Sequence, residues 1–242
     1  MERTVTLGNT RYERILVHTH RIEFGESLLA TLTRYAVPVT HKGDWIAISE
    51  KLVSVSQNNV RHISTVTPGW LAKLIVKGVK KYPNDIGFSR PEKMQLVVEL
   101  AGIPRTILAM LAGAAGKILG IRGIFWRIVG ARAAEIDGFN PDAMYPYTEY
   151  AALPPKNPEK VCADIEMQLG IPAVIIDGNN INVKVIAMST SVPVNAKTAR
   201  LILLDNPMGQ NDELTPFIVV RRLYGNGPIK PALASIIDSV TK

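Results

Sequence analysis

The stretch LGIPAVIIDGNNINVKVIAM, Leu169 to Met188, decides the fold that the sequence predicts. Ala173 to Ile176 is a short apolar run rich in β-branched residues, which is typical of a strand buried on both faces. It ends at Asp177-Gly178-Asn179-Asn180, and alternation of apolar and polar residues then resumes at Ile181. Two interpretations are open. Gly and Asn supply the positive φ angles of a tight hairpin turn. A carboxylate, a glycine and two amides at a strand end can also bind a metal or a phosphate.

The composition is that of a globular protein. The chain has 242 residues, of which 47% are hydrophobic and 20% charged, enough to bury a core in one large domain or two small ones. We expect a single unit spanning residues 1–242. Cys162 is the only cysteine, which excludes an internal disulfide framework and is typical of a reducing compartment. The first twenty residues carry charges throughout and lack an apolar signal-peptide core, so we expect a cytoplasmic protein.

Positive charge is concentrated in the middle of the chain. The formal net charge is +7, and eleven Lys or Arg stand against three acids between Arg61 and Arg127. This balance suits a phosphate-bearing ligand or an anionic membrane surface, but a solvated helix face explains it as well. Nucleic acid is not expected as a partner, because aromatic residues do not interleave with the cations and no nucleic-acid-binding signature is present.

The pattern along the chain predicts an α/β protein with mixed sheets. Strands are expected at 15–20, 45–48, 173–176, 181–185 and 217–220, and a strand-like alternation continues from 49 into a polar segment near 57. Helices are expected after the N-cap Ser27, at 68–82, from Pro158, within 191–210 with Lys197 and Arg200 exposed, and at 231–240. Residues 131–150 are expected to form a loop.

The segment from about 91 to 130 is basic and rich in glycine. It predicts two packed helices with a glycine-rich bend, and we interpret it as a helical insertion in the single unit. Its uncharged run from Thr106 to Gly116 is about half the ~20 residues that a membrane span requires. A dimer face and a helix lying at a membrane interface are both open interpretations.

Three segments, in this order, resemble the coenzyme F420-0:gamma-glutamyl ligase family. GDWIAISEKLVSVSQNN (43–59) is similar to the family's Gly-Asp, apolar strand and Lys-x-Val-Ser-Lys-Ala-Glu-Gly. IDGFN (136–140), with ALPPKNPEKVCADI and AVIID after it, resembles the family's Ile-Asp-x-x-Asn, Leu-Pro-x-x-Pro, helix, strand and Asp-Thr. MGQNDELTPFIVVRRL (208–223) is similar to its Met-Gly-Glu segment and closing Ile-Pro-Val-Val-Val-Arg-Gly strand. Order and spacing make the case, since no segment is diagnostic alone.

The resemblance implies a ligase of an unusual α/β fold that works as an intertwined homodimer, with GTP as co-substrate and Mg²⁺ or Mn²⁺ bound. The implied reaction transfers a phosphoryl group from GTP to a small-molecule carboxylate. The amine of an amino acid, glutamate in the family, then captures the acyl phosphate. Such chemistry requires a metal and cations to neutralise phosphate charge, and acids to hold the metal.

The resemblance also implies a site. Asp137 and Asp177 match the family's metal-binding acids, and the interpretation of Asp177 as a strand-end carboxylate agrees with this role. The polar residues that we expect to bind nucleotide or substrate are Ser54, Asn140, Asn179, Asn180, Lys184 and Gln210.

Four departures from the family pattern affect this site. The family's Lys-Ala-Glu-Gly reads Val55-Ser56-Gln57-Asn58, its Thr after the second Asp is Gly178, and its Glu after Met-Gly is Gln210. The arginines that follow that Thr in the family are absent, and Lys184 is the nearest cation in sequence. The alternative to a ligase is therefore a non-catalytic ligand-binding or regulatory homologue. Association of the basic segment with a membrane surface is a third possibility.

Two further features are local. His18 and His20 form an H-x-H that could place two ligands on one face of a strand, but a surface strand is the simpler interpretation. Cys162 lies in a helical pattern with no partner and is interpreted as a core residue.

Overall fold

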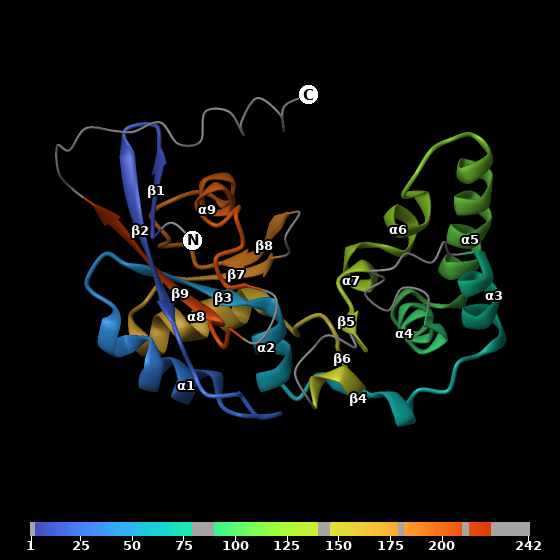
Figure 1. Cartoon of the computed structure of the whole chain (residues 1–242), viewed down its shortest axis with the longest axis horizontal. Helices are drawn as coiled ribbons and strands as arrows, with labels where there is room; N and C mark the ends of the chain where they lie inside the picture. The colour runs from blue at the N-terminus through green and yellow to red at the C-terminus, as the bar shows by residue number, and fades with distance from the viewer. Residues whose placement is uncertain (1–2, 79–89, 140–145, 179–181, 210–212, 224–242) are drawn as a thin grey trace. The chain divides into compact units, whose positions relative to one another are not determined.

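The computed structural model describes residues 3–78, 90–139, 146–178, 182–209 and 213–223 (Figure 1). The chain divides into two compact units, and each is described by itself. The first unit comprises Met1–Ser56 and Asn157–Lys242, and the second comprises Gln57–Lys156.

A six-stranded mixed sheet forms the centre of the first unit, with the strand order β1-β2-β9-β3-β7-β8. In that order the strands are β1 (Thr4–Leu7), β2 (Thr10–Val17), β9 (Phe217–Leu223), β3 (Trp45–Ser49), β7 (Ala173–Gly178) and β8 (Val183–Met188). β3 and β7 are parallel, and the other neighbouring strands are antiparallel. The predicted α/β class with a mixed sheet is confirmed.

Helices cover both faces of this sheet. α1 (Leu28–Tyr35), α2 (Glu50–Ser56) and α8 (Pro158–Leu169) lie on one side and α9 (Ala196–Ile202) on the other (Figure 1). Trp45, Ala47, Val174 and Ile176 pack in one apolar cluster with α9. Side chains alternate along a strand, so the fully buried Ile46 of β3 and Ile175 of β7, which lie between these residues in sequence, face the opposite side of the sheet.

Several predicted elements of this unit are confirmed. β3, β7, β9 and α8 lie where the sequence places them, and α1 begins after Ser27, whose Oγ accepts a hydrogen bond from the backbone N of Ala30 at 3.3 Å. Cys162 is a core residue, as predicted. Its burial raises the pKa of the thiol to about 12, with nearby Glu159 and Glu166 adding to the effect.

Other predictions for this unit are wrong in detail. Residues 50–56 form helix α2 and not a continuation of the strand, because the Leu/Val residues that suggested alternation are buried by tertiary packing around a short helix. The strand expected at 15–20 is β2 and ends at Val17. Arg200 is half-buried rather than exposed, since it hydrogen-bonds the start of β8.

The central stretch forms a hairpin, as the first interpretation predicted. β7 and β8 pair antiparallel, with Asp177 opposite Lys184 and Gly178 opposite Val183. A register shift between Ile175 and Ile176 marks a β-bulge. Residues 179–181, which join the strands, lie outside the described residues. The hairpin leaves the metal or phosphate interpretation open, because Asp177 lies near the carboxyl end of β7.

The second unit packs helices beside a small sheet. The sheet order is β4-β6-β5, with β4 (Val60–His62), β6 (Tyr150–Ala152) and β5 (Asp137–Gly138). The helices are α3 (Trp70–Gly78), α4 (Pro91–Ala101), α5 (Ile103–Ile118), α6 (Ile124–Val129) and α7 (Ala131–Ala134). Their shared core includes Leu71, Met94, Leu96, Ala109 and Phe139.

Two predictions for this unit need correction. The segment 91–130 holds three helices instead of two, because Gly120 and Gly123 at positive φ turn the chain from α5 into a separate α6. Residues 131–150 are not simply a loop but include α7, β5 and the start of β6. The close pairing of β5 with β6 requires Gly138, since a Cβ there would lie 2.7 Å from the Cα of Ala151.

Three expectations stay predictions. The helix expected at 231–240 lies outside the described residues. The single family unit with a helical insertion at about 91–130, and the intertwined homodimer, also stay predictions.

Candidate functional site

Three strands of the first unit end at one edge of its sheet. β2 and β3 are both antiparallel to β9, and β7 is parallel to β3, so β2, β3 and β7 run in the same direction. Ser49 pairs with Ile176, which places the next residues, Glu50 and Asp177, at neighbouring strand ends. Ligands of open α/β sheets bind beyond the carboxyl ends of such strands. This carboxyl edge is therefore the candidate site.

Asp177 and Lys184 share one face of the hairpin at this edge. They are register partners on β7 and β8, and directly opposed side chains project from the same face of a sheet. Asp177 is half-buried and Lys184 exposed. Two of the residues predicted from sequence are thus brought together, in an arrangement that serves either a cross-strand ion pair or a ligand site.

Helix α2 adds two buried polar residues. Glu50, which follows β3 directly, and Ser54, one turn later, are on the same side of the helix and are 7% and 1% exposed. The Oγ of Ser54 is buried without a hydrogen-bond partner in the described part of the chain. Because a buried hydroxyl without a partner is costly, Ser54 is suited to meet a polar ligand atom. Sequence alone does not reveal Glu50 as a site residue, because the apolar and polar alternation after residue 49 predicts a strand there.

Asn206 takes the space beside Gly178 in which a threonine would project. A Cβ on Gly178 would lie 2.7 Å from the Asn206 Oδ1. Asn206 is 4% exposed, adopts positive φ, and donates from Nδ2 to the carbonyl of Gly209 at 3.0 Å. An amide oxygen therefore stands next to a position where the family has a hydroxyl. Sequence reasoning missed Asn206, because only the tertiary fold brings it to β7.

We predict that Gly178 and Asn206 are energetically coupled. Gly178→Thr alone should lower the free energy of unfolding by about 2 kcal/mol, since the new side chain must displace a buried, hydrogen-bonded amide. Asn206→Gly keeps the positive φ accessible and removes the obstacle, so the double variant should be at least about 1 kcal/mol more stable than the sum of the single effects predicts. A double-mutant cycle in denaturant measures this coupling, and strictly additive costs would contradict it.

A buried arginine anchors the segment that carries Asn206. Arg14 of β2 donates to the carbonyl of Ile202 at 3.1 Å and to both carboxylate oxygens of Asp205. Thr215 Oγ1 donates to the carbonyl of Met208 at 2.7 Å. Arg14 belongs to the sheet, and Thr215 belongs to the segment that leads into β9. Their hydrogen bonds therefore hold the Met208-Gly209 segment at the carboxyl edge.

The same segment carries a carboxylate that sequence reasoning overlooked. A Cβ on Gly209 would lie 2.6 Å from each carboxylate oxygen of Glu213. Glu213 therefore lies over the Met-Gly segment, where the family's Glu is replaced by Gln210. Gln210 itself lies outside the described residues. Glu213 follows it three positions further along the chain.

Two of the replaced residues in Val55-Ser56-Gln57-Asn58 have structural explanations. Val55 is 3% exposed, so a lysine there would have to be buried. Gln57 accepts from the backbone N of Lys156 at 2.7 Å and donates to the carbonyl of the same residue at 2.8 Å. A carboxylate could accept the first bond but could not donate the second. Both residues are therefore fitted to structural roles here.

Asp137 is presented by the second unit. It lies on β5 opposite Ala152, half-buried, between the buried Ile136 and the Gly138–Phe139 pair. Since Asp177 belongs to the first unit, the joint role of the two acids stays a prediction. Asn140, Asn179 and Asn180 lie outside the described residues. Within the described ranges, no three His, Cys, Asp or Glu side chains gather as a metal site.

His18 and His20 follow β2 and do not lie on it. Both rings are exposed, which agrees with a surface position. The ring nitrogens of His20 contact the Tyr35 hydroxyl at 2.8 Å and Glu26 Oε2 at 3.0 Å, so both nitrogens have partners. Burial raises the pKa of Glu26, but hydrogen bonds from the Glu23 backbone, His20 and Thr31 outweigh it and hold that pKa below its usual value.

This network predicts a small acid dependence of stability. Because the folded-state pKa of Glu26 is lowered, its carboxylate stabilises the fold above pH ~4.5, and this contribution is lost as the pH falls through the folded-state pKa. Glu26→Gln should reduce the loss of stability between pH ~5 and ~3 by less than about 1 kcal/mol. Thermal unfolding across this pH range measures it. Glu23→Gln, which changes an exposed neighbouring carboxylate, should leave the acid dependence as in the parent protein.

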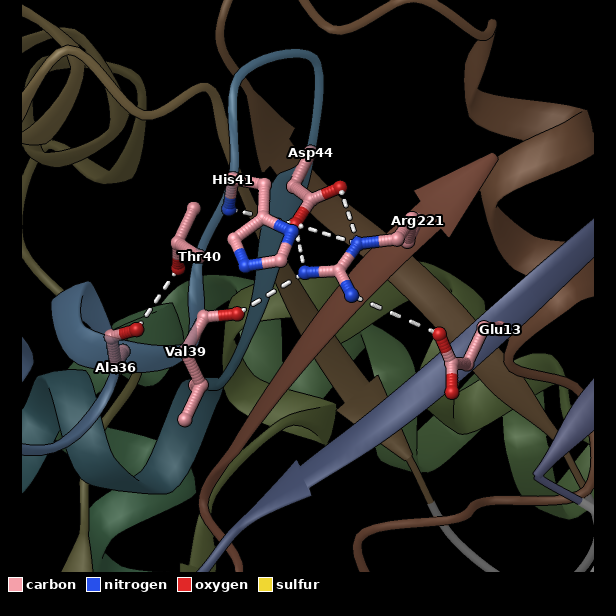
Figure 2. A network of polar contacts seen from close by, with 7 residues as sticks. All are labelled: Glu13, Ala36, Val39, Thr40, His41, Asp44 and Arg221. Atoms are coloured by element: carbon pink, nitrogen blue, oxygen red, sulfur yellow. Dashed lines mark hydrogen bonds and ion pairs between the residues drawn. The ribbon is translucent and has the colours of Figure 1, made fainter. Parts of the chain in front are cut away.

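The Gly-Asp motif of the first resembling segment forms a polar network at the opposite end of β3 (Figure 2). Asp44 accepts hydrogen bonds from the backbone N of His41 at 2.8 Å and from Arg221 Nη2 at 2.8 Å and Nε at 3.1 Å. Arg221 also donates to the carbonyl of Val39 at 3.1 Å and lies 3.7 Å from Glu13. Hydrogen bonding to Asp44 raises the pKa of Arg221, against a smaller opposing effect of burial. These motif residues join β3, β9 and β2, and their role is structural.

Comparison with known proteins now identifies the family. The model of the family described as F420-0:Gamma-glutamyl ligase matches residues 17–185. The matched range contains β3, α2, α8 and the β7–β8 hairpin up to Val185, with both predicted metal-binding acids. A search of curated proteins finds no match. The match spans well over half of the chain, and the protein therefore belongs to the F420-0:gamma-glutamyl ligase family.

Proposed function

We propose that this protein is a ligase that joins a small-molecule carboxylate to the amine of an amino acid, with a nucleotide, GTP in the family's pattern, and Mg²⁺ or Mn²⁺. The observation that carries the proposal is the carboxyl edge within the family-matched range. It combines the strand-end carboxylate of Asp177 with the buried hydroxyl of Ser54, which has no hydrogen-bond partner among the described residues.

The donor set at this edge suits a hard divalent cation. Asp177 and Glu213 carry carboxylates, and Ser54 and Asn206 offer neutral oxygens, which are the donor types that Mg²⁺ and Mn²⁺ prefer. Asp177 would hold the metal in the first unit, and Asp137 is proposed as the second acid. A bound metal would neutralise phosphate charge during phosphoryl transfer.

Other residues would orient the substrates. Lys184, across the hairpin from Asp177, would attract the anionic phosphate or carboxylate group. Ser54 would donate its hydroxyl hydrogen to an oxygen of that group. Asn140, Asn179, Asn180 and Gln210 complete the proposed polar site. Arg200 adds a guanidinium at the turn end of the hairpin, donating to Val183 O at 2.8 Å and to Asn182 Oδ1 at 2.7 Å.

A second candidate is a binding protein that has kept the fold and lost the chemistry. Val55 and Gln57 favour this candidate. Val55 is a core residue at the position of a family cation, and Gln57, at the position of a family carboxylate, hydrogen-bonds the backbone of Lys156. This candidate predicts ligand binding without nucleotide turnover.

Thermal unfolding with GTP, ATP or no nucleotide, each with and without Mn²⁺, tests the proposal. A ligand at a hundred times its dissociation constant stabilises by about 2.7 kcal/mol, which is readily visible. We expect a shift that needs both nucleotide and metal, followed by carboxylate-dependent release of nucleoside diphosphate. Binding without turnover over a panel of carboxylates would favour the second candidate, and no shift with any nucleotide would reject the ligase.

A further inference from the structure

Helices α5 and α6 form a hairpin whose tip is both apolar and cationic. Ile118, Leu119 and Ile121 are 86%, 73% and 49% exposed, and Lys117 and Arg122 flank them. We define these five residues as the α5–α6 tip. Large aliphatic side chains this exposed on consecutive residues indicate a contact surface.

The tip belongs to a well-packed hairpin. Gly113 and Gly116 of α5 let α6 approach closely, since a Cβ on Gly113 would lie 3.2 Å from the Cβ of Phe125, and one on Gly116 would lie 3.1 Å from the carbonyl oxygen of Ile121. The backbone N of Ile121 donates to the carbonyl of Gly116 at 2.7 Å. Packing against α6 therefore fixes the helix and leaves the tip outside the core.

An exposed stripe along α5 continues the apolar surface of the tip. Pro104, Leu108, Leu111, Ala115 and Ile118 follow each other at spacings of four and three residues, so they lie on one side of the helix. All five are exposed, and Leu108 and Leu111 are 59% and 61% exposed. One side of the hairpin is thus covered by apolar side chains over the length of α5.

The charge around this surface has one sign. Between residues 100 and 134 the chain has five Arg or Lys and no Asp or Glu. Lys117, Arg122, Arg127 and Arg132 are exposed and form no ion pair within the described part of the chain. Such a surface is complementary to a partner with anionic groups on its surface, which the cations would contact, and an apolar layer below them, which the aliphatic side chains would enter.

We propose that the α5–α6 hairpin docks on an anionic lipid bilayer, with the tip and the α5 stripe entering the interface. Basic amphipathic helices bind in this way, with cations at the headgroups and aliphatic side chains among the acyl chains. In the described residues no single helix is long and apolar enough to cross a membrane; α4 and α5 together satisfy length and composition but are bent by 117°. The proposal therefore concerns the membrane surface.

The same observations disfavour two other occupants. A second copy related by two-fold symmetry would place cations against cations, with no acid between residues 100 and 134 to pair them. A nucleic acid would meet aliphatic side chains where polar or stacking groups are needed, because Phe125 and Trp126 are half-buried in the helical core.

Co-sedimentation of the full chain with sucrose-loaded vesicles tests the proposal. We expect binding to vesicles that contain phosphatidylglycerol, weak binding to phosphatidylcholine alone, and weaker binding at high salt. Lys117→Gln/Arg122→Gln should reduce affinity for anionic vesicles about 25-fold, at about fivefold for each cation. Ile118→Ser/Leu119→Ser should reduce it about tenfold or more. Met167→Ser changes an equally exposed side chain on α8 and should have no effect.

A fluorescent label locates the contact independently. Cys162 is fully buried, so a cysteine introduced as Leu119→Cys can be labelled selectively with an environment-sensitive dye. Anionic vesicles should shift its emission to the blue but leave a dye at Met167→Cys unchanged. Failure to bind anionic vesicles, equal shifts at both positions, or tip variants that only abolish self-association in ultracentrifugation or binding to RNA would overturn the proposal.

Discussion

Asp44→Ala is expected to lower the free energy of unfolding by about 3–4 kcal/mol, the largest effect on stability that we predict. The side chain of Asp44 is 3% exposed and that of Arg221 is 23% exposed, so the pair is largely removed from water. Truncating Asp44 leaves the guanidinium with the Val39 carbonyl and the more distant Glu13 as its partners in the described part of the chain. It also leaves the His41 backbone N without its acceptor. An unpaired, desolvated charge costs more than the pair contributes.

Matched variants separate charge from shape at this position. Asp44→Asn keeps the volume and an acceptor for His41, so we expect about half of the loss. Asp164→Ala on α8 removes the half-buried partner of the exposed Lys160 at i,i+4 and should cost less than about 0.5 kcal/mol. Chemical denaturation followed by circular dichroism measures all three. A loss below about 1 kcal/mol for Asp44→Ala would show that the network is dispensable for the fold.

The sequence predicts the central part of the sheet well, because burial on both faces leaves a signal that local residues carry. Ala173–Ile176 and Phe217–Val220 are continuous apolar runs, and both are fully buried strands. Helix α8 has a proline at its start and a clear amphipathic pattern. The failure at 50–56 has a physical cause, since a short helix buried on several sides shows no helical period and its β-branched residues resemble a strand.

The candidate site could be predicted only in part. Asp177 and Lys184 were accessible to sequence reasoning because they are neighbours in one hairpin, with the register setting their pairing. Asn206 and Glu213 were not accessible, because Asn206 reaches Gly178 through the tertiary fold and Glu213 folds back over Gly209. The structural reasons for Val55 and Gln57 were equally hidden. The burial of Val55 depends on the tertiary fold, and the hydrogen bond from Gln57 reaches Lys156, 99 residues further along the chain.

Asp177→Asn is expected to weaken metal-dependent nucleotide binding on the order of 100-fold, and ligation by at least as much, if the carboxylate holds the metal. The amide keeps the size of the side chain but loses the charge that hard cations require. Titration of Mn²⁺ in the presence of nucleotide measures the affinity, and release of nucleoside diphosphate measures the reaction. Asp164→Asn, the same change on α8 in the same unit, should alter neither.

The structural alternative makes the opposite prediction. If Asp177 serves only as a cross-strand partner of Lys184, its loss should cost less than about 1 kcal/mol of stability and leave metal affinity unchanged. The exchange Asp177→Lys/Lys184→Asp separates the two roles, because it restores an opposite-charge pair across the same register. Recovery of stability with metal binding still lost would assign the carboxylate at residue 177 to the metal. Recovery of both would show that only the pairing matters and would reject Asp177 as a metal ligand.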